Sequence, residues 1–230
     1  MLNLANVSFA YGNVQALYDV TLAAPPGKVT AIMGRNGVGK TTLIKTICGL
    51  NRHFAGSVEL DGDDLSKQPT SKRAKAGVGL VPQGRQIFPK LTVEENLRVS
   101  LACRRDGKKS IPPEIFETFP ILKEFLPRKG GDLSGGQQQQ LAIARALVGD
   151  PKVLLLDEPT EGIQPNIIQQ IGVLLRKLAA GGMAVVLVEQ YLDFVKETTD
   201  RYYVMNRGRV VAEGETASMD DGVIAEHLHV

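Results

Sequence analysis

Three short motifs contain residues whose types and spacing suit phosphate chemistry. Residues 34–41 read GRNGVGKT and fit the pattern G-x-x-x-x-G-K-[ST], in which glycines let successive backbone N–H groups cradle phosphate oxygens. Residues 133–137 read LSGGQ, and residues 153–158 read VLLLDE, an apolar run that ends in two carboxylates. Together the motifs predict a chain that binds and hydrolyses ATP.

The phosphate loop and the two carboxylates predict separate roles. We expect Lys40 to reach the β- and γ-phosphates, Thr41 to offer its hydroxyl to Mg²⁺, and Thr42 to place a second hydroxyl near the phosphates. Asp157 ends its predicted strand and should hold Mg²⁺ through the water shell, while Glu158 should orient and deprotonate the attacking water. The predicted phosphate-binding residues are Gly34, Arg35, Asn36, Gly37, Val38, Gly39, Lys40, Thr41 and Thr42.

The LSGGQ motif predicts a second phosphate-binding surface. Ser134, Gly135, Gly136 and Gln137 fit the S/T-x-x-E/Q capping box, so the simplest interpretation is a capped helix. Two glycines in a first turn cost roughly 1 kcal/mol each relative to alanine, which a cap alone does not need. Bare backbone N–H groups at the positive end of a helix suit a phosphate. Because one loop already cradles a nucleotide, we expect this surface to meet a nucleotide held by another chain.

Composition and charge narrow the class of protein. The chain has 230 residues, 43% of them hydrophobic, which is enough for one sizeable core. Its 27 basic and 25 acidic residues are mostly interspersed, so we expect no nucleic-acid partner. The basic stretch 104–109 adjoins a turn signal and is expected to be a solvated loop. Cys48 and Cys103 are expected to be reduced thiols, and the absence of a signal-peptide pattern predicts an intracellular protein.

The elements that must position these motifs can be traced along the chain. We expect strands at 2–9, 17–24, 28–33, 57–60, 79–82, 153–157 and 184–188, and helices at 41–50, 92–103, 112–126, 135–148 and 166–180. Near-continuous apolar strands that alternate with helices are typical of a parallel sheet covered on both faces. Strand signals vanish between about Gln83 and Ala146, which predicts a helical subdomain inserted into the α/β core.

The order and spacing of the three motifs resemble the ATP-binding subunits of ABC transporters, over essentially residues 1–215. The resemblance implies an α/β fold: a P-loop NTPase (RecA-like) core with an N-terminal antiparallel β subdomain and an inserted helical subdomain. In this scheme one domain fills the chain. Residues 1–85 and 147–215 form the nucleotide-binding core with the β subdomain, 86–146 form the helical signature subdomain, and 216–230 form a tail that is either disordered or docks a partner.

Further site residues and partners follow from the same resemblance. Tyr11 looks like the aromatic residue that stacks on adenine, and Gln83 like the residue that links Mg²⁺ and the attacking water to the membrane subunits. The cofactors would be ATP and Mg²⁺, with two ATPs sandwiched head to tail between the phosphate loop of one chain and the LSGGQ motif of another. The partners would be a second ABC ATPase subunit in a heterodimer, two transmembrane permease subunits and an extracytoplasmic solute-binding protein, at the cytoplasmic face of the plasma membrane.

A finer resemblance concerns the solute. Residues 82–97, PQGRQIFPKLTVEENL, are similar to the importers of branched-chain amino acids and urea, and residues 158–171, EPTEGIQPNIIQQI, look most like the second ATP-binding subunit of urea-type importers. We therefore expect a urea importer ATPase, with a branched-chain amino acid importer as the alternative and a non-transport ABC ATPase as a remoter one. A P-loop kinase would leave LSGGQ unexplained.

Two positions depart from the family pattern. Most relatives place a histidine that contacts the γ-phosphate after the strand at 183–188, whereas this chain has Gln190. Glutamine can donate a hydrogen bond but cannot shuttle a proton near neutral pH. Gln164 lies where many relatives carry an aspartate. We expect Gln190 to act in catalysis, and the turnover of this site is left open.

Overall fold

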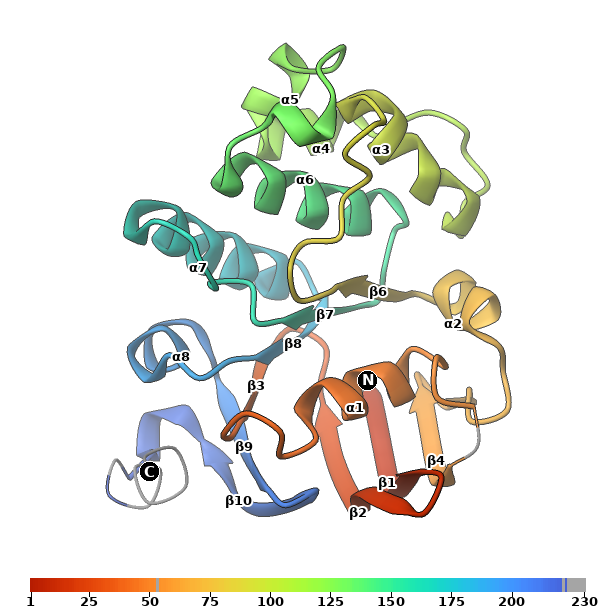
Figure 1. The fold of residues 1–230 in the computed structure, drawn as a ribbon, viewed down its shortest axis with the longest axis vertical. Helices are drawn as coiled ribbons and strands as arrows, with labels where there is room; N and C mark the ends of the chain where they lie inside the picture. The colour runs from red at the N-terminus through yellow and green to blue at the C-terminus, as the bar shows by residue number, and fades with distance from the viewer. Residues whose placement is uncertain (53, 221, 223–230) are drawn as a thin grey trace.

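Two β-sheets and the helices around them build the chain, and the computed structural model describes residues 1–52, 54–220 and 222 (Figure 1). The larger sheet has the strand order β10-β9-β3-β8-β7-β6. Its strands are β3 (Val29–Met33), β6 (Val78–Val81), β7 (Val153–Asp157), β8 (Ala184–Val188), β9 (Arg201–Asn206) and β10 (Arg209–Glu215). All neighbours pair in parallel except β10, which runs antiparallel to β9.

The parallel register brings the predicted chemistry to one edge of this sheet. Asp157 of β7 pairs with Val188 of β8, and Val188 pairs in turn with Ile32 of β3. The phosphate loop follows β3, the segment that begins at Glu158 follows β7, and the segment that begins at Glu189 follows β8. They leave the sheet side by side because carboxyl ends of parallel strands meet at the same edge.

The smaller sheet is antiparallel, with the strand order β2-β1-β4-β5. Its strands are β1 (Leu2–Tyr11), β2 (Val14–Ala24), β4 (Ala55–Leu60) and β5 (Asp63–Asp64). Helix α1 (Lys40–Ile47) contributes Leu43, Ile44 and Ile47 to one apolar cluster with residues of both sheets. This shared core fixes the start of α1, and therefore the phosphate loop, against both sheets.

The other face of the larger sheet carries most of the helices. These are α3 (Val93–Val99), the 3-10 turn η1 (Ser100–Cys103), α4 (Pro113–Thr118), α5 (Pro120–Glu124), the turn η2 (Gly130–Asp132), α6 (Gly135–Val148) and α7 (Pro165–Ala180). Figure 1 shows α3 to α6 gathered at one end of the molecule. Alternate residues of β7 explain the two layers, since Leu155 packs in the cluster with α1, whereas Leu154 and Leu156 pack in the cluster with α6.

Several predicted elements are confirmed and others are wrong in extent. The strands at 153–157 and 184–188 and the helix at 135–148 have the predicted bounds. The single helix expected over 112–126 is wrong: Pro120 lacks an N–H and forces Phe119 to φ −128° and ψ 71°, which separates α4 from α5. The helix expected over 92–103 ends at Val99 and continues as η1, and α1 ends at Ile47 because Gly49 turns the chain at φ +76°.

Among the described residues, five strands and α-helices were not predicted. These are β5, β9 and β10, helix α2 (Thr70–Ala76) and helix α8 (Leu192–Thr198). Both helices have only seven residues, too few for a clear helical period. In the predicted tail, Thr216–Ser218 form a 3-10 turn, whereas residues 221 and 223–230 lie outside the described residues.

Three further expectations concern the surface and the thiols. The stretch 104–109 lies in a loop whose residues 105–109 are exposed, as predicted. Arg104 is partly buried and donates to Asp106 and the Val148 carbonyl, and Arg105 donates to Asp150. Cys48 and Cys103 are free thiols, as predicted. No helix in the described part of the chain has the length and apolar character needed to cross a membrane.

Candidate functional site

The loop between β3 and α1 has the backbone shape of a phosphate cradle. Gly34, Gly37 and Gly39 take φ values of 145°, 78° and 110°, which glycine adopts without strain. A Cβ at Gly34 would collide with the Met205 carbonyl oxygen, and one at Gly39 would lie 2.9 Å from the Ala16 oxygen. Helix α1 begins with no side-chain cap and no acidic residue in its first turn. Its first N–H groups can therefore serve an anion.

Lys40 is the cation at the centre of this loop. Its side chain is 5% exposed, and Nζ donates to the carbonyl oxygens of Gly34 at 2.7 Å and Arg35 at 2.9 Å. Burial lowers the pKa of Lys40, and the nearby carboxylates of Glu158 and Asp157 oppose that effect. The Lys40 Nζ lies 3.6 Å from Glu158 Oε1, so a cation and a carboxylate face each other across the site.

Asp157 is a buried carboxylate that lacks full hydrogen bonding. It ends β7, and its Oδ1 has no hydrogen-bond partner. Burial raises the pKa of Asp157, and a hydrogen bond with the Thr41 side chain opposes the rise. An unpartnered buried carboxylate oxygen beside a threonine hydroxyl is an arrangement that a hard divalent cation would satisfy.

The Glu158 carboxylate accepts hydrogen bonds from two separate segments. Gln190 Nε2 donates to Glu158 Oε1 at 2.6 Å and also to Asn36 Oδ1 at 2.8 Å. Gln83 Nε2 lies 3.1 Å from both Glu158 Oε2 and Glu161 Oε2. The Glu158 backbone takes a φ of 49°, unusual for a residue with a side chain. The carboxylate is thus aimed back at the phosphate loop.

A cleft of about 690 Å³ opens above these groups. Tyr11 stands at its edge with 50% of its surface exposed, its hydroxyl 3.5 Å from Thr42 Oγ1 and its ring edge-on to Phe9 at 4.8 Å. Arg207 and Gly208 also line the cleft, because the β9–β10 turn lies against the loop and the Gly208 N–H donates to the Val38 carbonyl at 2.8 Å. Such a lining suits a flat ring at one end and phosphates at the other.

The LSGGQ motif forms a separate surface. Ser134 caps α6, its Oγ accepting from the Gln137 N–H at 3.4 Å while Gln137 Oε1 accepts from the Ser134 N–H at 2.9 Å. A second hollow of about 420 Å³ is lined by this motif together with Gly162, Gln164 and Ile167, and it shares no lining residue with the first cleft.

The glycines of this motif have a structural reason beyond an approaching ligand. A Cβ at Gly135 would lie 3.1 Å from Arg85 Nη1, and one at Gly136 would lie 3.2 Å from Ile167 Cγ1. The expectation that only bare backbone toward another molecule explains the glycine pair is therefore incomplete. A larger residue would require the Arg85 or Ile167 side chain to shift by a few tenths of an ångström, so packing within the chain also favours glycine.

Residues 17–161 match the family model described as ABC transporter. The chain belongs to the ABC transporter family. It is an ABC ATPase, which binds ATP and couples ATP hydrolysis to transport.

Known proteins resemble this ABC ATPase along nearly its whole length. It is 40% identical over 220 residues to the high-affinity branched-chain amino acid transport ATP-binding protein BraG of Pseudomonas aeruginosa, covering 95% of this chain and 94% of that protein. It is 37% identical over 218 residues to a probable branched-chain amino acid transport ATP-binding protein, LivF, of Archaeoglobus fulgidus, covering 93% and 92%. A dimeric ATP-binding cassette in a post-hydrolysis state, bound to ADP and Pi, has a TM-score of 0.82 at 28% identity and covers 95% of this chain and 100% of that one. The predicted ABC ATPase fold is confirmed.

The structure brings most predicted site residues of the ABC ATPase together. The cleft is lined by Tyr11, the loop residues from Asn36 to Thr42, Gln83 and Glu158, with Asp157 buried beside Thr41 and Gln190 hydrogen-bonded to Glu158. Ser134, Gly135, Gly136 and Gln137 lie apart, in the second hollow. Arg207 was missed: the sequence NRGR could have indicated a hairpin turn, but not that this turn lies against residue 38.

Proposed function

We propose that this ABC ATPase powers an importer of branched-chain amino acids. The observation that carries the proposal is its near-full-length similarity, at 40% and 37% identity, to two proteins named for branched-chain amino acid transport. The urea importer expected from residues 158–171 has no such support. We therefore propose the branched-chain amino acid importer, which was the alternative, in its place. A non-transport role likewise has no support among these relatives.

We place ATP in the first cleft. Tyr11, half exposed at the edge, would stack on the adenine ring, and the N–H groups of the loop with those of the first turn of α1 would hold the phosphates. Lys40 would turn its Nζ from its own loop carbonyls toward the β- and γ-phosphates. Arg207 adds a cation to the cleft lining that the sequence did not predict.

Mg²⁺ fits the residues beside the phosphate loop. The Thr41 hydroxyl and the unpartnered Asp157 oxygen would hold it, and the Gln83 amide oxygen is the third candidate because its amide nitrogen donates to Glu158 and Glu161. When bound, the ion supplies charge neutralisation at the β- and γ-phosphate oxygens.

Hydrolysis would depend on Glu158 and Gln190. Glu158 accepts the proton of the attacking water as the water oxygen bonds to the γ-phosphorus and the bond to the β,γ-bridging oxygen breaks, releasing ADP and phosphate. Gln190 Nε2 donates one N–H to Glu158 at 2.6 Å and so orients this carboxylate, and its second N–H, which donates to Asn36 at 2.8 Å, would turn to the γ-phosphate. Gln190 remains a donor only, because an amide cannot take up the proton.

The second hollow is proposed to complete the nucleotide site of another ATPase subunit. The Ser134 hydroxyl and the first-turn N–H groups of α6 would contact a nucleotide held by the partner, and the partner's equivalent surface would cover the nucleotide of this chain. The structurally similar dimeric cassette bound to ADP and Pi supports pairing of two such chains. We propose that the partner is a different ATPase subunit, so that the pair is a heterodimer.

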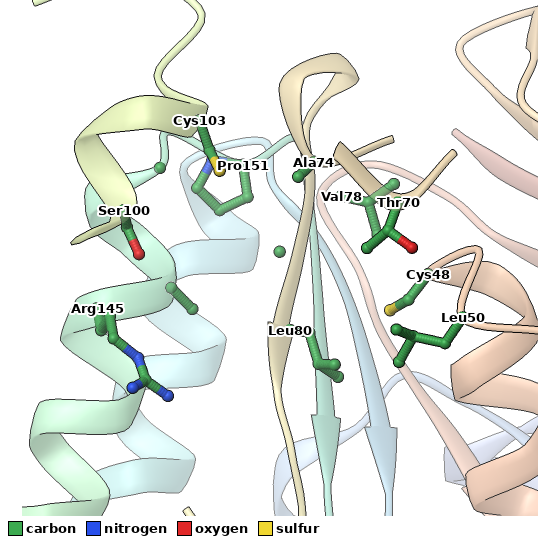
Figure 2. Close-up of a pocket in the computed structure, with 13 residues that line it drawn as sticks. Cys48, Leu50, Thr70, Ala74, Val78, Leu80, Ser100, Cys103, Arg145 and Pro151 are labelled. Atoms are coloured by element: carbon green, nitrogen blue, oxygen red, sulfur yellow. The ribbon is translucent and has the colours of Figure 1, made fainter. Parts of the chain in front are cut away.

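An apolar groove offers a place for the permease subunits. Figure 2 shows Ser100, Cys103 and Arg145 on one side of a cavity of about 250 Å³, with Cys48, Leu50 and Thr70 on the other. Leu50 is 54% exposed, and Arg145 Nη1 has no hydrogen-bond partner. We propose that a permease segment with apolar side chains and a carboxylate or free carbonyls docks here, which places the chain at the cytoplasmic face of the membrane.

The solute can be tested with the assembled transporter. The full chain is purified with its permease and ATPase partners, and ATP hydrolysis is measured while the solute-binding protein is loaded with leucine or with urea. We expect leucine, but not urea, to stimulate hydrolysis. Stimulation by urea alone would contradict the branched-chain assignment, and a chain that purifies without hydrophobic subunits would contradict the transport role.

A further inference from the structure

A buried carboxylate that the proposed hydrolysis does not use lies directly after β8. Glu189 is 3% exposed, and its backbone N–H donates to the Ile32 carbonyl of β3 at 3.2 Å. It does not line the ATP cleft. Burial raises the pKa of Glu189, and hydrogen bonds from Thr160, Gln190 and Tyr191 oppose the rise.

The two oxygens of this carboxylate join two segments that leave different strands. Oε1 accepts from the Thr160 hydroxyl at 2.6 Å and from the Thr160 N–H at 3.2 Å. Oε2 accepts from the N–H groups of Gln190 at 3.0 Å and Tyr191 at 3.3 Å. Thr160 follows β7 and Gln190 follows β8, so one side chain connects both strand ends.

Each of these segments carries one of the groups proposed to act on the attacking water. Glu158 lies two residues before Thr160, and Gln190 directly follows Glu189. Glu158 takes a φ of 49°, a left-handed conformation that persists for such a residue only when its surroundings hold it there. One support is the bond from the Glu158 N–H to the Val188 carbonyl at 3.0 Å, and the tie between Thr160 and Glu189 is another.

We propose that Glu189 is a positioning residue, whose carboxylate fixes the segment of Glu158 against the segment of Gln190 and so sets the 2.6 Å contact between their side chains. This inference rests on the roles proposed above for Glu158 and Gln190. Glu189 itself touches neither cleft nor phosphate loop through any hydrogen bond of its side chain in the described chain.

Two substitutions separate this role from general stability. Glu189→Gln keeps the size of the side chain but turns one acceptor oxygen into an N–H₂ donor, which must then face either the N–H groups of Gln190 and Tyr191 or the Thr160 donors. Thr160→Val removes only the hydroxyl donor and keeps the backbone bond. Glu213→Gln, on an exposed position of β10, is the matched control.

The first readout is hydrogen exchange of the nucleotide-free full chain, which does not depend on turnover or on the solute. In Glu189→Gln, the amides of Thr160, Gln190 and Tyr191 should exchange roughly tenfold faster or more, while amides inside β7 and β8 keep their parent rates. In Thr160→Val the amide of residue 160 should exchange faster to a smaller extent, because only its backbone bond then holds the Glu189 carboxylate. Glu213→Gln should leave all of these rates unchanged.

The second readout is steady-state hydrolysis by the assembled complex. In Glu189→Gln we expect kcat to fall roughly 10- to 100-fold, because Glu158 is displaced from the attacking water. The KM for ATP should stay within about twofold of the parent, because the contacts proposed for ATP do not involve Glu189. Thr160→Val should show a smaller loss of kcat in the same direction, and it carries the test if Glu189→Gln does not fold.

Unchanged exchange at the three amides in a folded variant would overturn the proposal. So would a parent kcat, or a loss confined to KM. If the exchange rates of the three amides rise as expected but the parent complex hydrolyses no ATP, then Glu189 does join the two segments, and it is the proposed function that fails.

Discussion

At the scale of single residues, the site holds buried charged groups, and one of them lacks full hydrogen bonding within the chain. Burial raises the pKa values of Asp157 and Glu189 and lowers that of Lys40. Glu189 receives hydrogen bonds to both oxygens, whereas one oxygen of Asp157 receives none. We therefore expect the charged Asp157 side chain to lower stability when no cation is bound and to favour cation binding.

Neutralising Asp157 should stabilise the chain when no Mg²⁺-ATP is added. A pKa raised in the folded state means that the folded chain holds the proton more tightly than the unfolded chain, so the charged carboxylate costs stability above its folded pKa. If Asp157→Asn recovers about 1 kcal/mol, its Tm near neutral pH rises by roughly 2–4 °C. The difference should shrink as the pH falls through the window between the raised pKa and the unfolded value of about 4. Thermal unfolding with and without Mg²⁺-ATP is the measurement.

The matched control is Asp132→Asn, which removes an exposed carboxylate from η2 and should leave Tm nearly unchanged. Asp157→Asn should also lose the extra stabilisation that Mg²⁺ adds to ATP. A Tm of Asp157→Asn at or below the parent value near neutral pH would contradict the claim that the charged Asp157 side chain lowers stability.

Residues within a motif could be predicted from the sequence, and isolated ones could not. The loop from Gly34 to Thr42 and the pair Asp157 and Glu158 carry their chemistry in their spacing. Arg207 and Glu189 have no such signal, because their roles depend on which turn lies against the loop and which donors surround a strand end.

At the scale of elements, helix ends determine where the predicted chemistry lies. Two helices begin with complete capping boxes: α6 with Ser134 and Gln137, and α3 with Thr92 and Glu95. Only the first box lines a hollow proposed to meet a nucleotide. Comparing these two capping boxes therefore distinguishes the role of a cap in helix stability from its proposed role in nucleotide binding.

Ser134→Ala and Thr92→Ala should destabilise the chain alike but differ in function. Each removes one N-cap acceptor, which costs about 1 kcal/mol and lowers Tm by roughly 2–4 °C. Only Ser134→Ala should also lower ATP hydrolysis of the assembled complex, since only Ser134 would contact the partner's nucleotide. Equal hydrolysis by the two variants, measured at a temperature where both are folded, would confine the LSGGQ motif to capping.

Helices and strands could be predicted where the pattern of apolar residues was long. They could not be predicted where that pattern was short or interrupted. Helix α6 and strand β7 have strong signals and lie where expected. The region 112–126 was expected to be one helix because its apolar period continues through Pro120, whose missing N–H breaks the helix. Strand β10 alternates exposed and half-buried residues at a sheet edge and has no apolar run to mark it.

At the scale of the whole molecule, one mostly parallel sheet aligns three loops, and the chain presents two separate hollows. The segment from Glu158 to Gln164 connects these surfaces, because Glu158 lines the first cleft and Gln164 lines the second hollow. Seven consecutive residues therefore join the cleft proposed to hold ATP to the hollow proposed to meet the partner's nucleotide. The division of the chain at residues 86 and 146 stays a prediction, as does the pairing with a second ATPase. The solute could not be predicted from the site residues, because it is bound by other subunits in the proposed transporter.

The central claim is that this chain hydrolyses ATP with Glu158 as the base. Glutamine keeps the size of the side chain but cannot take the proton, so Glu158→Gln should lower hydrolysis by the assembled complex roughly 10²- to 10⁴-fold and leave bound ATP intact. Glu161→Gln is the matched control, because Glu161 shares the Gln83 amide with Glu158 at the same 3.1 Å but does not line the cleft. The decisive measurement is the nucleotide retained by each complex after incubation with ATP. We expect ATP in Glu158→Gln and ADP in the parent and in Glu161→Gln, whereas hydrolysis at the parent rate by Glu158→Gln would contradict the account.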